Sequence, residues 1–339
     1  MTAELCLGID VGSVSTNLVL IDMDGKVVEK LYLRTNGRPI DAIIKGMGDL
    51  KDKMSNDAVV IGAGTTGSGR QLARAIVGAD IMKNEITAHA TAACHVVPEV
   101  RTILEIGGQD SKIIFMENGI VCDFSMNTVC AAGTGSFLDR QASRLDIPIE
   151  EFGGYALRSK SPVRIAGRCA VFAESDMISK QQAGHSAEDI IAGLCEALVR
   201  NYLNNLAKGK SISGPILFQG GVAANVGILA AFEKSLNRKI IIPQHYDVMG
   251  AYGAALLARD EIEFTGQHTC FNGFDHLSHE FSAESFACSG CANMCEVVRI
   301  KSDETYIAHW GDRCGKWAID SANAAKNTSE HTEKEAFSS

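Results

Sequence analysis

The sequence lacks a long apolar run. No stretch approaches the roughly 20 consecutive apolar residues that a membrane-spanning helix needs. The chain also begins Met-Thr-Ala-Glu-Leu-Cys-Leu-Gly, without the basic segment that precedes the apolar part of a secretory signal peptide. We therefore expect a cytoplasmic protein that has no membrane as its partner.

Positive charge is scarce relative to negative charge. The chain has 32 Lys and Arg against 41 Asp and Glu, which gives a formal net charge of −9. Because nucleic-acid binding depends on neutralising phosphates with basic residues, this balance argues against nucleic acid as the principal partner. The length of 339 residues and the apolar fraction of 46% suit two lobes with substantial cores plus an appendage.

A P-loop is also missing. The segment Gly62–Arg70 is rich in glycine, but it lacks the Gly-Lys-Ser/Thr ending that places a lysine on the phosphates. We interpret this segment as a flexible loop and assign it no role.

A strand-turn-strand pattern occurs twice in the sequence. In the first copy an apolar run ends in Asp10, turns through Val11-Gly12-Ser13 and continues as Asn17–Ile21. A two-residue turn at Asp24-Gly25 then leads into a third run. Two such hairpins in one chain would imply two similar lobes.

In the second copy the first strand ends in Glu105, and Ile106–Ser111 form the turn. The strand Lys112–Met116 and a two-residue turn at Asn118-Gly119 complete the copy. Glycines and small hydroxyl residues in such turns leave backbone N–H groups directed at phosphate oxygens, and an acidic residue at the strand end can hold Mg²⁺ through water. One copy alone is explained by an ordinary β-turn, whereas two copies favour a nucleotide site.

These motifs resemble a known family. Leu7–Ser13, Glu105–Lys112 and Asn127–Ser136 are similar to the activators of 2-hydroxyacyl-CoA dehydratases and to the ATPase subunits of benzoyl-CoA reductase, the BadF/BadG/BcrA/BcrD type. That family belongs to the actin, hexokinase and heat-shock chaperone ATPase superfamily. The resemblance runs from about Glu4 to Arg259 and implies an α/β, two-lobed actin-like (ribonuclease H-like) fold that binds ATP between its lobes.

The resemblance also implies a domain organisation. Asn84–Ala90 and Gly250–Leu256 would be the helices that connect the lobes, with small residues suited to a hinge. We expect lobe I at 1–96 and 246–270, lobe II at 97–245, a small C-terminal Cys-rich module at 271–318 and a disordered tail at 319–339.

The family motifs assign site residues by position. Asp10 and Asp110 would hold Mg²⁺-bound water, and Gln109 would place the attacking water. Lys112 either approaches the phosphates or faces solvent. The remaining predicted ATP contacts are Gly12, Ser13, Val14, Ser15, Thr16, Glu105, Gly107, Gly108, Gly133, Thr134, Gly135, Gly220, Gly221 and Asn225. Gly220-Gly221 would admit the adenosine, although a tight strand-helix turn also explains them, and Asn225 would lie near a helix N-terminus.

Eleven cysteines in a cytoplasmic protein indicate metal or redox chemistry rather than disulfides. Cys130 and Cys169 each precede a helical pattern, and a helix N-terminus favours a thiolate. Taken alone they are better explained as small buried apolar residues. The family resemblance instead implies that two subunits of a homodimer share one 4Fe-4S cluster, each donating this pair.

The other clustered cysteines follow the region of resemblance. Cys288, Cys291 and Cys295 form a C-x2-C-x3-C cluster, and Cys314 follows two strand-like segments, Glu296–Ile300 and Thr305–Trp310. This spacing suits four thiolates on either zinc or a second iron-sulfur cluster, while unmetallated thiols are the alternative.

The resemblance implies an ATPase that drives electron transfer. Reduced ferredoxin or flavodoxin would load the 4Fe-4S cluster, and ATP hydrolysis would drive delivery of the electron to an acyl-CoA dehydratase or another iron-sulfur acceptor. Two alternatives remain at this point. One is a sugar or N-acetylhexosamine kinase of the same fold, and the other is a nucleotide-switched, metal-bearing binding module without turnover.

Overall fold

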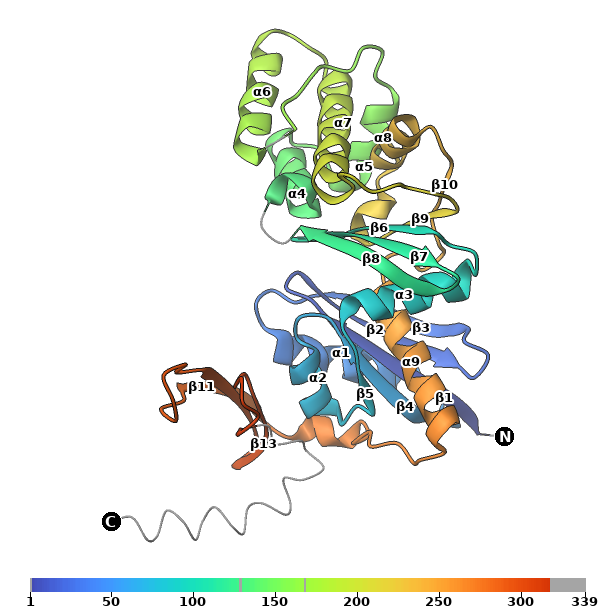
Figure 1. Ribbon diagram of the computed structural model, residues 1–339, viewed down its shortest axis with the longest axis vertical. Coiled ribbons are helices and arrows are strands. Elements are labelled where there is room, and N and C mark those ends of the chain that lie inside the picture. Colours follow the sequence, from blue (N-terminus) through green and yellow to red (C-terminus); the bar gives the residue numbers. More distant parts are fainter. Residues whose placement is uncertain (1, 128–129, 168, 318–339) are drawn as a thin grey trace. The chain divides into compact units, whose positions relative to one another are not determined.

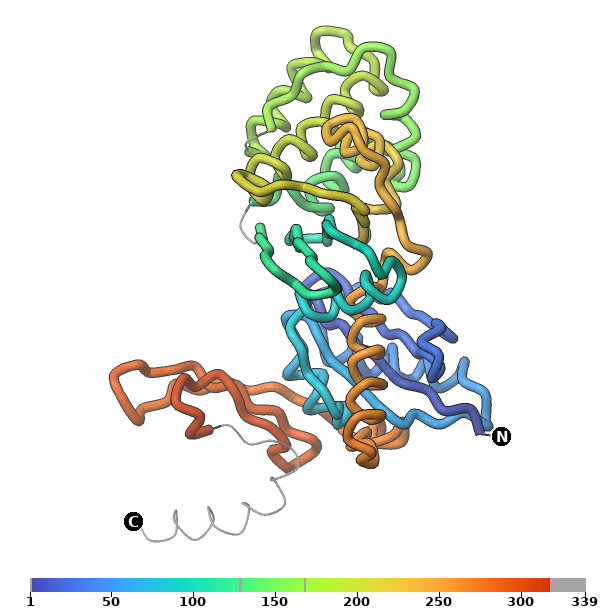
Figure 2. The backbone as a smooth tube through the Cα atoms, turned by 45° about the vertical axis from the view of Figure 1, so that its right-hand side comes forward, coloured from blue at the N-terminus to red at the C-terminus, as the bar shows by residue number. Residues whose placement is uncertain are grey.

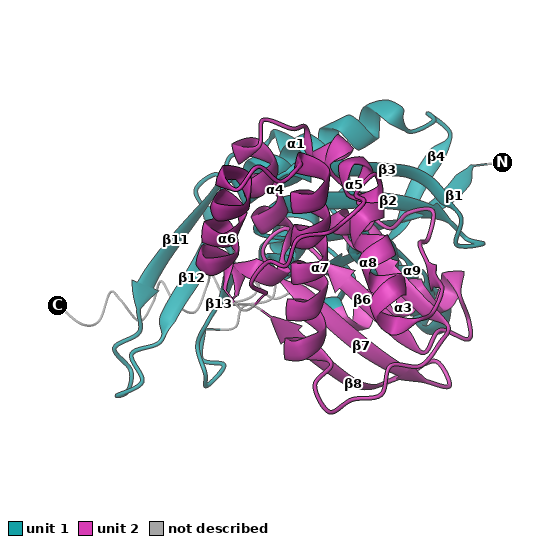
Figure 3. Ribbon diagram, turned by 90° about the horizontal axis from the view of Figure 1, so that it is seen from above, with its two compact units in different colours: residues 1–85, 250–339 teal, residues 86–249 magenta. Residues whose placement is uncertain are grey.

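The computed structural model describes residues 2–127, 130–167 and 169–317. It divides into two units, Met1–Glu85 with Gly250–Ser339 and Ile86–Met249 (Figure 3). The chain passes between the units near the start of α3 (Glu85–Val96) and near the start of α9 (Met249–Thr265), so both predicted connecting segments are helical. The predicted tail at 319–339 lies outside the described residues.

Unit 1 contains a five-stranded sheet in the order β3-β2-β1-β4-β5. Its first three strands are antiparallel neighbours, whereas β1, β4 and β5 run parallel. Their apolar residues form one core with α1 and α2, in which Leu7, Ile9 and Leu18 are fully buried. The bounds are β1 Ala3–Val11, β2 Ser15–Asp22, β3 Val27–Arg34, β4 Ala58–Thr66, β5 Ile81–Met82, α1 Pro39–Lys53 and α2 Arg70–Val77.

Helix α9 packs closely on this sheet because two strand residues have no side chain. A Cβ atom at Gly8 would lie 1.9 Å from the carbonyl oxygen of Ala251, and one at Gly64 would lie 2.2 Å from that of Ala254. Figure 2 shows α9 running along the strands of unit 1. The small residues of the second connector therefore serve a tight helix-sheet contact.

Two sequence expectations in unit 1 are wrong. Gly62–Arg70 is not a flexible loop, because its first five residues belong to β4, where Ala63 and Thr65 are buried. The turn at Asp24-Gly25 is one residue longer than predicted. Asp22 N–H donates to the Lys26 carbonyl (3.0 Å), which leaves three loop residues, and Gly25 takes the left-handed conformation at φ 83°.

Unit 2 contains a second five-stranded sheet in the order β10-β9-β6-β7-β8, and helices α4 to α8 gather on one side of it (Figure 1). The turn at Asn118-Gly119 is a two-residue turn, as predicted, with φ of 50° and 77°. The bounds are β6 Thr102–Ile106, β7 Ser111–Glu117, β8 Ile120–Asn127, β9 Ile216–Gln219, β10 Ile240–Ile241, α4 Gly135–Arg144, α5 Ile149–Leu157, α6 Ala170–Gln182, α7 Ala187–Leu206 and α8 Val226–Leu236.

Aromatic residues fill the core of unit 2 between the sheet and these helices. Phe232 of α8 makes edge-to-face contacts with Tyr202 of α7 and Phe218 of β9, at centroid distances of 5.2 and 5.3 Å. Such pairs add about 0.5–1.5 kcal/mol beyond the burial of their area. This packing fixes α7 and α8 over β9, the strand that precedes the predicted adenosine segment.

The residues after α9 form a three-stranded antiparallel sheet in the order β11-β12-β13. The two strands predicted there are β12 (Glu296–Ser302) and β13 (Thr305–Trp310), and β11 (Phe281–Ala287) is an additional strand. Phe281 and Ile300 join the core of unit 1. No helix among the described residues is both long and apolar enough to cross a membrane.

Candidate functional site

The two predicted hairpins have the same hydrogen-bonding pattern. In unit 1 the Gly12 N–H donates to the Ser15 carbonyl at 2.8 Å, and in unit 2 the Gly107 N–H donates to the Asp110 carbonyl at 3.0 Å. Each turn has four residues between paired strand ends, Val11 with Thr16 and Ile106 with Ser111. The repeat seen in the sequence is therefore a structural repeat.

This equivalence pairs the acidic residues at the strand ends. Asp10 is opposite Asn17 across its hairpin, and Glu105 is opposite Lys112 in the second hairpin. The cross-strand neighbour of Asp10 is neutral, whereas that of Glu105 is a cation. The two hairpins therefore have the same backbone hydrogen-bonding pattern but differ in the charge of these cross-strand pairs.

Lys112 is a buried cation in the second hairpin. Its Nζ lies 3.1 Å from Glu105 Oε2 and 2.6 Å from Asp110 Oδ2, and its side chain is 5% exposed. Burial disfavours its charge, but the two carboxylates outweigh that effect and raise the Lys112 pKa. Of the two alternatives for Lys112, the one in which it faces solvent is therefore wrong, and the lysine neutralises part of the charge beside the second turn.

The glycine-rich segment after β4 packs on the first hairpin. A Cβ at Gly67 would lie 2.3 Å from Asp10 Oδ1, and the Gly69 N–H donates to the Val11 carbonyl at 2.9 Å. Among the described residues, the buried hydroxyls of Thr65 and Thr66 have no hydrogen-bond partner. Because β1 and β4 pair in parallel, the carboxyl ends of both strands lie side by side. The glycine pattern in the sequence does not predict this contact.

The backbone of the first turn has unused donors. Gly12 to Ser15 are partly or fully exposed, and Thr16 is buried, with its hydroxyl 3.0 Å from that of Thr35. Among the described residues, the N–H groups of Ser13 and Val14 make no hydrogen bond. Free N–H groups in a glycine turn are suited to phosphate oxygens.

The Gly133–Gly135 segment lies against the second turn. Gly135 N–H donates to the Gly107 carbonyl at 2.9 Å, and Ser136 N–H donates to the Gly108 carbonyl at 2.8 Å. The Thr134 hydroxyl is used locally, donating to the Ala131 carbonyl at 2.9 Å. The structure therefore brings together two of the predicted nucleotide segments.

The predicted adenosine segment reaches the same place. Gly220 has φ 88°, and a Cβ there would lie 2.8 Å from Glu105 Oε1 and 2.5 Å from the Ile106 carbonyl oxygen. Gly221 starts the short helix η2 (Gly221–Ala224) and is exposed. Both a ligand site and a tight strand-helix turn remain compatible with these glycines.

Asn225 is the N-cap of α8, as its predicted position near a helix N-terminus suggested. Its Oδ1 accepts from the N–H groups of Gly227 and Ile228 at 3.0 and 3.1 Å. Its Nδ2 is buried and has no hydrogen-bond partner within the described part of the chain. A nucleotide contact would use this donor. Because Oδ1 caps the helix and Nδ2 is the unpaired donor, a substitution can remove one function and keep the other.

We expect Asn225→Asp to keep the cap and to lose the Nδ2 donor. The free energy of unfolding should change little, whereas nucleotide affinity should fall by about tenfold, the equivalent of about 1.4 kcal/mol. Asn225→Ala should lose about 1 kcal/mol of stability as well. Chemical denaturation and nucleotide titration measure the two effects, and unchanged affinity in Asn225→Asp would leave Asn225 as a cap alone.

His89 of the first connector is a hydrogen-bonded histidine. Its Nδ1 lies 2.8 Å from Gln219 Nε2, and burial together with the nearby Lys112 charge lowers the His89 pKa to about 3. The ring is therefore neutral, and Nδ1 accepts the amide proton of Gln219. This contact joins α3 to the residue that precedes Gly220.

Cys130 and Cys169 occupy equivalent local positions. Cys130 is the N-cap of the short helix η1 (Ala131–Gly133), and Cys169 is the N-cap of α6. Both side chains are partly exposed. Helix α6 contacts η1, and Glu174 of α6 forms ion pairs with Arg144 (2.7 Å) and Arg140 (3.4 Å) of α4. Two accessible thiols at helix starts fit half of the ligand set of a 4Fe-4S cluster.

The C-terminal cysteines lie at one end of the three-stranded sheet. Cys288 N–H donates to the Cys295 carbonyl at 2.8 Å, and Cys288 Sγ accepts from Trp317 Nε1 at 3.2 Å. Within 2–127, 130–167 and 169–317, no three His, Cys, Asp or Glu side chains are arranged to hold a metal ion. Metal binding by Cys288, Cys291, Cys295 and Cys314 therefore stays a prediction.

Comparisons with known proteins agree on one family. Residues 7–258 match the BadF/BadG/BcrA/BcrD ATPase family. The (R)-2-hydroxyglutaryl-CoA dehydratase activating ATPase of Acidaminococcus fermentans is 35% identical over 258 residues, covering 74% of this chain and 96% of that protein. A subunit of the benzoyl-CoA reductase of Thauera aromatica is 30% identical over 262 residues, covering 74% and 91%.

A solved structure extends the similarity to the fold. The activator of the 2-hydroxyisocaproyl-CoA dehydratase from Clostridium difficile, solved with bound ADPNP, superimposes with a TM-score of 0.70 at 31% identity. The match covers 77% of this chain and 97% of that one. The predicted two-lobed actin-like α/β fold is thus confirmed, and the C-terminal sheet lies beyond the residues that match the family.

Proposed function

The chain belongs to the BadF/BadG/BcrA/BcrD ATPase family, and from this premise we propose that it is an ATP-dependent activator of an acyl-CoA dehydratase or a related acyl-CoA reductase. Relatives with these named roles support the proposal. Nucleotide binding is further supported by the similar activator solved with ADPNP. In the proposed activity, ATP hydrolysis drives one-electron transfer from a ferredoxin or flavodoxin to the acceptor enzyme.

The positions of Cys130 and Cys169 are the observation that supports electron transfer as part of the proposed activity. They provide two accessible thiols at helix starts in the unit that also carries a phosphate hairpin. We propose that a homodimer supplies four such thiolates. A 4Fe-4S cluster bound there would take up and release one electron at low potential. The N-terminal ends of η1 and α6 would favour its negative charge.

Residues of the two hairpins would have different roles in binding and hydrolysing ATP. Asp10 and Asp110 would hold Mg²⁺-bound water, and Lys112 would compensate part of the charge on Asp110 and Glu105. The free N–H groups of Ser13 and Val14 would bind phosphate oxygens. Gln109, which is exposed, would position the attacking water. None of these roles needs a covalent enzyme intermediate.

The energy scale of the proposal is adequate. Moving one electron through one volt corresponds to about 23 kcal/mol by ΔG = −nFΔE. A few tenths of a volt is then a few kcal/mol to roughly 10 kcal/mol, a quantity that one or two nucleotide hydrolyses can drive. ATP hydrolysis could therefore deliver an electron at a potential that the donor alone does not reach.

We expect the purified protein to release inorganic phosphate and ADP in equal amounts without an added sugar. An activator transfers the phosphoryl group to water, whereas a kinase of the same fold transfers it to a hydroxyl group. The measurement is phosphate and ADP release with and without glucose or N-acetylmannosamine. If ADP forms only when the sugar is present, and no inorganic phosphate is released, the protein is a kinase and not an activator. ATP binding without turnover would favour a nucleotide-switched binding module.

A further inference from the structure

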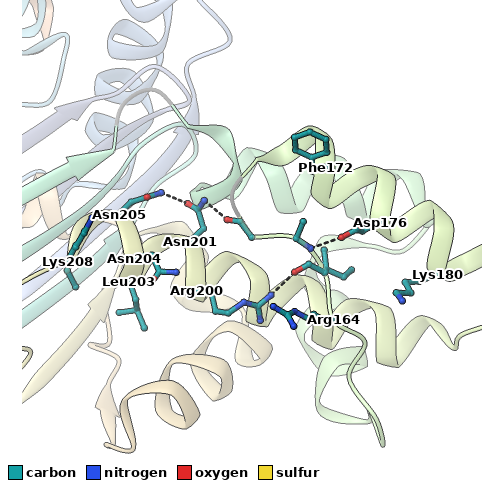
Figure 4. Close-up of a pocket in the computed structure, with 14 residues that line it drawn as sticks. Arg164, Phe172, Asp176, Lys180, Arg200, Asn201, Leu203, Asn204, Asn205 and Lys208 are labelled. Atoms are coloured by element: carbon teal, nitrogen blue, oxygen red, sulfur yellow. Dashed lines mark hydrogen bonds between the residues drawn. The ribbon is translucent and has the colours of Figure 1, made fainter.

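Unit 2 contains an open cavity of about 1390 Å³, lined by the segment 164–167, by α6 and by α7 (Figure 4). Its basic lining residues come from all three of these segments and from the residues just after α7. Among the described residues they are Arg164, Lys180, Arg200 and Lys208, and Asp176 is the one lining carboxylate. In a chain with a net charge of −9, this local excess of positive charge distinguishes the cavity from the rest of the sequence.

The charges of the cavity are only partly compensated. Asp176 accepts from the Ala166 N–H at 2.8 Å, and Arg200 donates to the Ile165 carbonyl at 2.6 Å. Glu196 lies 3.9 Å from Arg200. Within the described ranges, Arg164, Lys180 and Lys208 form no ion pair. The four lining cations outnumber the carboxylates of Asp176 and Glu196, and this excess of positive charge attracts an anionic ligand.

The size and lining of the cavity favour a macromolecular ligand. Small-molecule pockets measure about 300–1,000 Å³ and are lined mainly by apolar and aromatic side chains. This cavity is larger, and most of its side chains are charged or carry amides, including Asn201, Asn204 and Asn205. Its basic residues are spread over several segments, as the interface of a carboxylate-rich protein surface requires.

The cavity adjoins the backbone that leads to Cys169. Gly167 lines it two residues before the cysteine, and its carbonyl accepts from Asn201 Nδ2 at 2.5 Å. Phe172, Asp176 and Lys180 also line it, and all three belong to α6, which starts immediately after Cys169. A protein that docks in the cavity therefore contacts the helix capped by a predicted cluster ligand.

We propose that this basic cavity docks an acidic one-electron carrier protein of the ferredoxin or flavodoxin class. Cys130 and Cys169 would hold the cluster that takes up the one electron given up by the reduced carrier, and no bond would be made or broken. The inference rests on the proposed function. It adds where the donor binds and which residues select it.

The test is the affinity of the full-length protein for a purified acidic bacterial ferredoxin, with a flavodoxin as the second probe. In Arg164→Glu/Lys180→Glu the dissociation constant should rise at least about tenfold at about 0.01 M salt. The difference from wild type should disappear at about 1 M salt, where charges are screened within about 3 Å. Lys26→Glu, an exposed lysine in the unit 1 hairpin, is the matched control and should bind as wild type does.

Three results would overturn the inference. In the first, wild type and the double variant bind the carrier with equal affinity, or neither binds it. Another is a double variant that sediments as a different oligomer, which would make this face an interface between copies of the chain. A third is loss of affinity for the acceptor enzyme alone. Failure of the proposed function looks different, because wild type would then bind no iron or would not hydrolyse ATP, whatever its affinity for the carrier.

Discussion

Asp10→Asn should reduce the rate of ATP hydrolysis by about 10³-fold and leave the iron content unchanged. The substitution is isosteric and removes a carboxylate at the end of β1, directly before the first turn. Loss of one preorganised electrostatic contact in an active site costs about 10²–10³-fold in kcat, and loss of a metal-bound water contact adds to it. Steady-state phosphate release measures the effect.

Asp24→Asn is the matched control for Asp10→Asn. Asp24 lies in the distal turn of the same hairpin and is exposed, so its loss should leave hydrolysis unchanged. Unimpaired hydrolysis in Asp10→Asn would remove Asp10 from the site. Joint loss of hydrolysis, iron and the unfolding transition would indicate a folding defect rather than a catalytic role.

Lys112→Met should lower both stability and hydrolysis. It leaves Glu105, which is 5% exposed, without its cation, and breaking a buried ion pair in this way costs about 3–5 kcal/mol. It also makes the charge beside the turn more negative, which repels a triphosphate more than a diphosphate. We expect hydrolysis to fall by about 10²-fold and affinity for a non-hydrolysable ATP analogue to fall about tenfold more than affinity for ADP.

The double variant Lys112→Met/Glu105→Gln separates these two effects. Removing the buried charge together with its partner should restore most of the free energy of unfolding. Recovery of the ATP-to-ADP affinity ratio is expected to be incomplete, because Asp110 remains without its cation. If Lys112→Met weakens ATP and ADP binding equally, Lys112 only supports the fold.

The hairpins could be predicted from sequence because their signals are local. Asn118-Gly119 requires two left-handed residues, and the structure has both. The charge difference between the hairpins could not be predicted, because strand alternation alone does not say whether Lys112 faces solvent. Only the register that places it opposite Glu105, and the fold that buries both, determines the ion pair.

Two segments were misjudged because glycine and small polar residues give weak strand signals. Gly62 and Gly64 read as loop residues, yet they lie in β4, where the absence of a side chain at Gly64 lets α9 approach. β11 was missed because only Phe281 at its start is buried, and this burial depends on the core of unit 1. Both strands are specified by tertiary contacts rather than by local pattern.

The central claim is tested most directly by measuring iron, sulfide and zinc per chain after anaerobic purification. Electron paramagnetic resonance of the dithionite-reduced protein accompanies this measurement. A 4Fe-4S cluster shared by two subunits predicts about two irons per chain in a dimer. This iron should be lost in Cys130→Ala and in Cys169→Ala and kept in Cys122→Ala, which removes an exposed cysteine of β8. Zinc, or iron beyond this amount, would belong to Cys288, Cys291, Cys295 and Cys314. A wild-type protein without iron after anaerobic reconstitution would contradict the account.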